Sequence, residues 1–271
     1  MRANRRAPTT GPFVLAVVGP AGAGKSTVAR ALASAPGAVL LDADRMGHEV
    51  TDRDPEVRAA LAADYGPEVY RADGTLDRAR VAERVFREPA ALARLNALVH
   101  PRILARLRSG IAEATRTGAG LVVIDAALLL DWNLERECDA VIAVLAAPER
   151  QVERLVARRG WSEDEARRRL AAARSHDSFA SLADAVVRND GAESEAVATA
   201  TRWLEGRRAA RRGGGACSPA CSHDCAARWG SSQRVAVASA SDSAPSLRTT
   251  AAASEAKEAC VRAAARGRRA W

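Results

Sequence analysis

The segment GPAGAGKS at residues 19–26 constrains the fold of this chain more than any other feature. It matches the phosphate-binding pattern G-x-x-x-x-G-K-[ST], and it stands between a short apolar run and a segment with helical periodicity. In that context the loop N–H groups and the N-terminal end of the helix bind phosphate oxygens. The lysine of the motif reaches the β and γ phosphates, and the serine binds Mg²⁺. The motif predicts a nucleotide site formed by Gly19, Ala21, Gly22, Ala23, Gly24, Lys25, Ser26 and Thr27.

Short continuous apolar runs recur along the chain and predict buried strands. They lie at residues 13–18, 38–41, 121–124, 140–145 and 185–187. Runs of this kind are typical of a parallel sheet that helices cover on both faces. The expected fold class is therefore α/β: a three-layer phosphate-loop fold with a parallel five-stranded sheet.

Helical periodicity fills the segments between these runs. Helices are expected at residues 26–35, 148–158, 162–174 and 193–208. The stretch 44–118 is too long for a simple crossover, so it predicts a helical insertion, with Pro89 and Pro101 near helix boundaries. Ser162 and Glu165 have the spacing of a capping box, which predicts a helix start.

Composition and charge divide the chain into three parts. Of the formal charge of +8, residues 1–12 hold +3 and residues 211–271 hold +6, so residues 13–210 carry −1. A nearly neutral domain with basic ends is not typical of a specific nucleic-acid-binding protein. We expect a basic N-terminal extension at 1–12, a globular domain at 13–210 and a low-complexity, disordered tail at 211–271.

Apolar runs and cysteines bear on where the protein works. The longest apolar run, residues 119–130, is 12 residues long, whereas a membrane-spanning helix needs about 20. Cys138 is the single cysteine of the globular domain, which indicates a reducing compartment such as the cytoplasm. The tail cysteines Cys217, Cys221 and Cys225 lack the tighter spacing of common zinc sites, so we expect no metal there.

Three aspartates follow predicted strands. Asp42 and Asp44 come directly after the run 38–41, and Asp125 follows the run 121–124. Carboxyl ends of strands in an open α/β sheet face the ligand crevice, where one carboxylate can accept a proton and another can hold a metal ion. The alternatives are that Asp44 only caps a helix and that Asp125 is a buried, hydrogen-bonded residue without a metal role.

Cationic side chains share one face of the helix expected at 148–158. Gln151, Arg154 and Arg158 stand at positions i, i+3 and i+7 of this helix. Arginines on a mobile lid can stabilise a phosphoryl-transfer transition state, although arginine is abundant throughout this chain. His100, which precedes Pro101, is expected from the residues alone to be a capping or packed histidine.

The order of these motifs resembles the dephospho-coenzyme A kinase family over residues 13–205. The resemblance lies in GPAGAGKST, VLLDADRMGHEV, GTLDRARVAERVFREPAALARLNALVHP, VIDAALLLDWNLERECDAVIAV, PERQVERLVARRGWSEDEARRRL and LADAVVRNDG. It implies that ATP, with Mg²⁺, phosphorylates the ribose 3′-hydroxyl of dephospho-CoA. It also implies a helical substrate-binding subdomain at about 44–118 and a lid at about 148–175.

The resemblance assigns roles to particular residues of this chain. Asp44 would be the base on the acceptor hydroxyl, with Asp42 also on the substrate side. The substrate subdomain would contribute Arg78 and His100. Over the phosphates would lie Lys25, Arg154 and Arg158, with Ser26 and Asp125 on the metal and Asn189 near the adenine of ATP.

The chain departs from the family pattern at four places. Proline is usual where Ala127 stands and glutamate where Asp131 stands, a glutamine is usual near Ala173, and a lysine or arginine is usual near Phe179. Two alternative functions therefore stay open. One is a kinase of another small hydroxyl acceptor such as a nucleoside, and the other is a nucleotide-binding protein without turnover. The sequence predicts no oligomeric state.

Overall fold

The computed structural model describes residues 11–212, without the side chains of 83–87 and 89. The described residues up to Arg202 belong to one compact unit, and a second unit begins at Trp203. The predicted basic extension, the tail and the tail cysteines lie outside the described residues, apart from positions 11–12 and 211–212.

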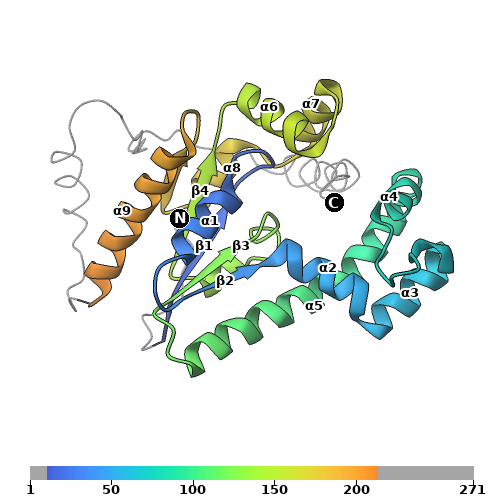
Figure 1. Cartoon of the computed structure of the whole chain (residues 1–271), viewed down its shortest axis with the longest axis horizontal. Coiled ribbons are helices and arrows are strands. Elements are labelled where there is room, and N and C mark those ends of the chain that lie inside the picture. Colours follow the sequence, from blue (N-terminus) through green and yellow to red (C-terminus); the bar gives the residue numbers. More distant parts are fainter. Residues whose placement is uncertain (1–10, 213–271) are drawn as a thin grey trace, which may run out of the picture. The chain divides into compact units, whose positions relative to one another are not determined.

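A five-stranded, wholly parallel sheet forms the centre of the first unit, as the apolar runs predict (Figure 1). Its strands, in the spatial order β2-β3-β1-β4-β5, are β1 (Phe13–Val18), β2 (Ala38–Asp42), β3 (Leu121–Asp125), β4 (Ala140–Leu145) and β5 (Ala185–Arg188). The order reverses at β1, which has β3 on one side and β4 on the other. A ligand crevice is expected where the order reverses, at the carboxyl ends of these strands.

Helices cover both faces of the sheet. The helix α1 (Lys25–Ala33) packs on β1, β3 and β4. Three helices lie between β4 and β5 in the chain, namely α6 (Pro148–Arg159), α7 (Glu163–Ala172) and α8 (His176–Leu182). The last helix, α9 (Glu193–Arg212), follows β5. The two helices α6 and α7 pack against each other, and α8 packs on β4.

The segment between β2 and β3 is a helical insertion, as its length predicts. It contains α2 (Ala43–Arg53), α3 (Pro55–Tyr65), a 3₁₀ turn (Pro67–Val69), α4 (Arg78–Arg87) and α5 (Pro89–Arg116). Figure 1 shows α3 and α4 beyond the ends of α2 and α5 that lie away from the sheet. The insertion therefore extends from the β2 edge, next to the crevice.

The prediction that Pro101 lies near a helix boundary is wrong, because α5 continues through it. A proline inside a helix removes one hydrogen bond and costs about 3 kcal/mol. Burial of apolar side chains before and after Pro101 offsets this cost, since Val99, Ile103 and Leu107 are 0%, 4% and 0% exposed. Pro89 does begin the helix, as predicted, at a position where its missing N–H costs nothing.

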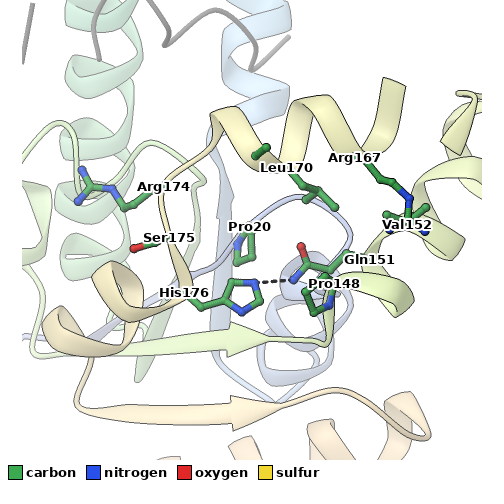
Figure 2. Close-up of a pocket in the computed structure, with 10 residues that line it drawn as sticks. Pro20, Pro148, Gln151, Val152, Arg167, Leu170, Arg174, Ser175 and His176 are labelled. Carbon is green, nitrogen blue, oxygen red and sulfur yellow. Dashed lines mark hydrogen bonds between the residues drawn. The ribbon is translucent and has the colours of Figure 1, made fainter. Parts of the chain in front are cut away.

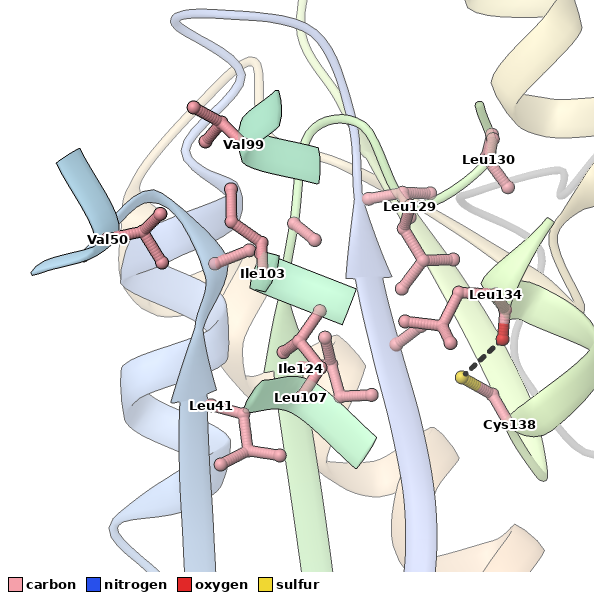
Figure 3. Packing of buried hydrophobic residues seen from close by; sticks show 14 of the residues in the cluster. Leu41, Val50, Val99, Ile103, Leu107, Ile124, Leu129, Leu130, Leu134 and Cys138 are labelled. Carbon is pink, nitrogen blue, oxygen red and sulfur yellow. Dashed lines mark hydrogen bonds between the residues drawn. The ribbon is translucent and has the colours of Figure 1, made fainter. Parts of the chain in front are cut away.

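The main hydrophobic core lies between α5 and one face of the sheet. Figure 3 shows Ile103 and Leu107 of α5 beside Leu41 of β2 and Ile124 of β3. The other face of the sheet is covered by α1, whose Val28 and Leu32 are buried outside this cluster. This packing fixes the insertion against the strands whose ends carry the aspartates.

We expect Ile103→Val to lower the free energy of unfolding by about 0.5–1.5 kcal/mol, because it removes one buried methylene from this core. The matched control is Ile111→Val on the same helix, since Ile111 is only partly buried and should cost less. Chemical denaturation of the two variants measures the difference. Equal losses at both positions would contradict the core assignment.

Two further elements differ from the sequence prediction. The helix expected at 162–174 ends at Ala172, and the separate helix α8, which was not predicted, follows it. The helix start at Ser162 is confirmed, because the Ser162 hydroxyl accepts a hydrogen bond from the N–H of Glu165 at 3.2 Å. The last helix runs to Arg212 rather than ending at residue 208.

Candidate active site

The phosphate loop joins β1 to α1, as the motif predicts, and its glycines have the backbone that only glycine adopts easily. Gly22 has a φ of 75°, and a Cβ there would lie 2.7 Å from the carbonyl oxygen of Gln151. Gly24 has a φ of 90° and is the N-cap of α1. Side chains at either position would push the loop away from α6 or strain the start of α1.

Two side chains from distant segments hold this loop. Asn189, which follows β5 and is 1% exposed, donates from Nδ2 to the carbonyl oxygen of Ala23 at 2.8 Å. Arg154 of α6 donates to the carbonyl oxygens of Gly22 at 3.4 Å and Asn189 at 3.0 Å. The structure thus brings the expected lid arginine Arg154 and Asn189 together at the loop.

Arg158 lies elsewhere, although it shares a helix with Arg154. Its guanidinium donates to Oε1 of Glu193, in the first turn of α9, at 2.8 Å. Gln151, the third residue of the predicted face, is 1% exposed, and its side chain lies against the carbonyl oxygen of Ala146 and the ring of His176. Among the described residues, the Arg154 side chain and the Gln151 backbone contact the loop, whereas the Arg158 side chain points to α9.

The carboxylate of Asp125 stands at the crevice. It ends β3, beside Val17 of β1 and Asp42 of β2 in the strand register, and it is 6% exposed. Burial raises the pKa of Asp125, while the Lys25 ammonium and a hydrogen bond with Ser26 act to lower it. Among the described residues its Oδ1 atom has no hydrogen-bond partner. A buried carboxylate oxygen of this kind, beside a serine hydroxyl, fits the ligand set of Mg²⁺.

We expect Asp125→Asn to stabilise the metal-free protein near neutral pH. The folded pKa of Asp125 is raised, so its ionised form costs stability above that pKa, and the cost disappears once the pH falls below the pKa of the unfolded chain. The gain of the variant over wild type should therefore shrink toward acid pH. Urea denaturation with a chelator, at neutral and acid pH, measures this difference, and a gain that grew on acidification would contradict it.

The two aspartates after β2 have separate roles in the structure. Asp42 is the N-cap of α2, where its Oδ1 accepts a hydrogen bond from the N–H of Arg45 at 2.9 Å. Asp44 lies in the first turn of α2 with an exposed side chain, so the alternative that Asp44 caps the helix is wrong. Asp44 is close enough to Asp125 to raise its pKa further. Its carboxylate therefore stands at the crevice without a capping role.

Arg78, at the start of α4, is anchored inside the insertion. Its Nη2 donates to Oδ1 of Asp52 at 3.0 Å and to the hydroxyl of Thr51 at 3.1 Å. Its Nε is buried and has no partner among the described residues. Asp52 was not identified from the sequence, yet Asp44, His48 and Asp52 stand at i, i+4 and i+8 of α2, so helical spacing was a signal for it.

His100 lies on α5 against a residue that the sequence did not single out. Its ring makes an edge-to-face contact with Trp132, with the ring centroids 5.3 Å apart. Burial lowers the pKa of His100, so the imidazole is neutral near pH 7. Its Nε2 and the Nε1 of Trp132 are buried without hydrogen-bond partners in the described part of the chain. Free polar atoms on both rings suit contact with a polar ligand.

The four departures from the family pattern take different places. Phe179 is 4% exposed and belongs to the main core. Asp131 forms an ion pair with Arg174, whose Nη1 also donates to the hydroxyl of Ser178 at 2.9 Å. Ala127 is half-buried and Ala173 is exposed. At Phe179 the structure thus has an apolar core contact.

Neither a membrane-spanning helix nor a cluster of metal-ligating side chains occurs among the described residues of 11–212. No helix there has both the length and the apolar character to cross a membrane. No group of three or more histidine, cysteine, aspartate or glutamate side chains could hold a metal ion. A metal ion at Asp125 would therefore rely on the serine hydroxyl, nucleotide oxygens and water for its other ligands.

Comparisons of sequence agree with this geometry. A family model described as dephospho-CoA kinase matches residues 13–195. The dephospho-CoA kinase of Thermobifida fusca is 40% identical over 190 residues, which cover 70% of this chain and 94% of the relative. The dephospho-CoA kinase of Corynebacterium glutamicum is 37% identical over 190 residues, with the same two coverages of 70% and 94%.

Solved structures have the same fold. The crystal structure of TT1252 from Thermus thermophilus is 29% identical with a TM-score of 0.60, and the match covers 72% of this chain and 98% of that one. Dephospho-CoA kinase from Campylobacter jejuni is 19% identical with a TM-score of 0.51, over 72% of this chain and 97% of that one, which supports the fold alone. With the family model and relatives above 30% identity in agreement, the chain belongs to the dephospho-CoA kinase family.

Proposed function

We propose that this protein transfers the γ-phosphoryl group of ATP to the ribose 3′-hydroxyl of dephospho-CoA, giving coenzyme A and ADP. Membership of the family is the observation that carries the proposal. The geometry supports it, because a phosphate loop, a buried carboxylate and an exposed carboxylate meet at the point where the strand order reverses.

The loop and its neighbours would bind the phosphates of ATP. The loop N–H groups and the N-terminal end of α1 supply positive potential, and Lys25 begins that helix. Arg154 would turn its guanidinium from the loop carbonyls to the phosphates as the lid closes, and Arg158 would leave Glu193 to join it. Asn189 would lie beside the adenine of ATP.

Asp125 and Ser26 would hold Mg²⁺, which when bound neutralises charge on the β and γ phosphates. Asp44 would accept the proton of the 3′-hydroxyl, since it stands beside Asp125 and does not cap α2. Asp42, which caps α2, would lie on the substrate side of that arrangement. Each of these groups acts by position and charge, as phosphoryl transfer requires.

The helical insertion would bind the acceptor. Arg78 is held by Asp52 and can turn its remaining N–H groups toward the anionic diphosphate of dephospho-CoA. His100 is neutral and would contribute its unpartnered Nε2 as a hydrogen-bonding atom. We place the protein in the cytoplasm, because its core holds one buried free cysteine, Cys138. We propose no specific nucleic-acid or membrane partner.

The deciding experiment measures ADP release by the full-length chain with ATP, Mg²⁺ and dephospho-CoA, against a control without acceptor. The proposal expects acceptor-dependent ADP and a product heavier by one phosphate. ADP release with a nucleoside but not with dephospho-CoA would favour a different acceptor. ATP binding without turnover of any acceptor would favour a nucleotide-binding protein.

A further inference from the structure

A cavity of about 420 Å³ lies beside the first turn of the phosphate loop. Figure 2 shows Pro20 of the loop next to Gln151 and Pro148 of α6 and His176 of α8. Most of its walls are apolar, including Val152, Leu170 and Ala171. A flat aromatic ring fits walls of this kind. Because Pro20 of the phosphate loop lines the cavity, a ligand group bound there would lie close to the transferred phosphate.

One buried amide gives this cavity a fixed polarity. Gln151, which is 1% exposed, donates from Nε2 to the carbonyl oxygen of Ala146 at 2.6 Å. The same Nε2 lies 2.7 Å from Nε2 of His176. A backbone carbonyl only accepts, so the amide cannot reverse without losing that bond. Both N–H groups are thus in use, and Oε1 is the atom of Gln151 that is available to accept from a ligand.

We assign the cavity to the acceptor side of the site on the contacts of its lining residues. Arg174 lines it and is paired with Asp131, which precedes Trp132, the residue that contacts His100. The wall at His176 belongs to α8, whose Phe179 shares the main core with the insertion helix α5. Arg154 and Asn189, expected on the ATP side, are not among the residues that line this cavity in the described part of the chain.

We propose that this cavity binds the adenine ring of dephospho-CoA, with the 6-amino group donating to Oε1 of Gln151. The inference rests on the proposed function. The reacting hydroxyl stands on the ribose that carries this base, so the adenine is the part of the acceptor that lies within one sugar of the phosphate loop. Arg167, at the cavity wall, is paired with Glu163 at 3.6 Å and would turn its guanidinium toward the neighbouring diphosphate.

The first test fills the cavity with Ala171→Trp, because Ala171 is exposed and lines it. We expect at least about a tenfold rise in the KM and the Kd for dephospho-CoA, since the side chain would occupy the place of the adenine ring. The Kd for AMPPNP, a non-hydrolysable ATP analogue, should stay within about twofold. The matched control is Arg168→Trp, at an exposed residue of the same helix outside the cavity, which should change neither constant.

The second test keeps the protein unchanged and alters the base. Dephospho-CoA with hypoxanthine in place of adenine presents an oxygen, rather than an amino group, to Oε1 of Gln151. The amide is held by Ala146, so we expect the analogue to bind at least about tenfold more weakly than dephospho-CoA. Calorimetry of the wild-type protein measures both affinities.

The outcomes separate this inference from the proposed function. If wild type phosphorylates dephospho-CoA and Ala171→Trp leaves its KM and Kd unchanged, the cavity is not the adenine site and only this inference falls. An equal loss of AMPPNP binding would assign the cavity to ATP and would also overturn it. If wild type neither binds nor phosphorylates dephospho-CoA, both proposals fall. Equal affinity for dephospho-CoA and its hypoxanthine analogue would show that Gln151 does not recognise the 6-amino group of adenine.

Discussion

Replacing Lys25 by alanine is expected to lower kcat for dephospho-CoA phosphorylation by at least ~100-fold, the scale seen when one preorganised charge is removed from a transition state. Lys25 begins α1 at the phosphate loop, and its ammonium is close enough to Asp125 to act on the pKa of that carboxyl. Charge on the transferred phosphoryl oxygens develops at this point, so the loss should affect kcat more than the binding of dephospho-CoA.

The globular domain at 13–210 contains no other lysine. The chain has two lysines, Lys25 and Lys257, and its other basic side chains are arginine or histidine. Lys25→Arg keeps the charge but replaces a compact ammonium by a planar fork, so we expect only partial activity. Steady-state kinetics with Arg30→Ala, at an exposed residue in the last turn of the same helix, supplies the control. A turnover of Lys25→Ala near that control would remove Lys25 from catalysis.

Strands and the phosphate loop could be predicted from the sequence because their signals are local. Each strand is built on a continuous apolar run, and parallel strands covered on both faces need such runs. The loop carries its own motif, in which Gly22 and Gly24 have positive φ. The predicted strand ranges therefore differ from the structure by one residue at most.

Helix boundaries could not be predicted as well, because packing overrides local preference. Pro101 predicts a break, but burial of Val99 and Ile103 keeps α5 continuous. The helix α8 escaped prediction because HDSFASL is short and has a single deeply buried side chain, Phe179. Periodicity needs more than one buried position to be visible.

The ion pairs that shape the candidate site could not be predicted from the sequence for a different reason. Arg78 and Asp52 are 26 residues apart, and Arg174 and Asp131 are 43 apart. Spacing within one helix shows which residues share a face, but it does not show which face of another element lies opposite. The motifs located the ATP side of the site, whereas its acceptor side depends on these long-range contacts.

Asp44→Asn should lower kcat by at least ~100-fold and leave the fold and ATP binding intact, on the scale of a lost general base. The fold should survive because Asp42, and not Asp44, caps α2. Amide and carboxylate have nearly the same size, so the change removes the proton acceptor without opening a gap. It also removes one negative charge near Asp125, which acts to raise that pKa, so Mg²⁺ binding is measured separately.

The matched control is Glu49→Gln, the same chemical change on the same helix, at a residue paired with Arg45 and Arg106. Exposed ion pairs of this kind contribute about 0–1 kcal/mol, so the control should fold and turn over like wild type. Rapid-quench measurement of a single turnover reports the chemical step itself. If Asp44→Asn matches Glu49→Gln in that measurement, another group or water takes the hydroxyl proton. The Asp44 carboxylate would then be needed neither as the base nor for its charge.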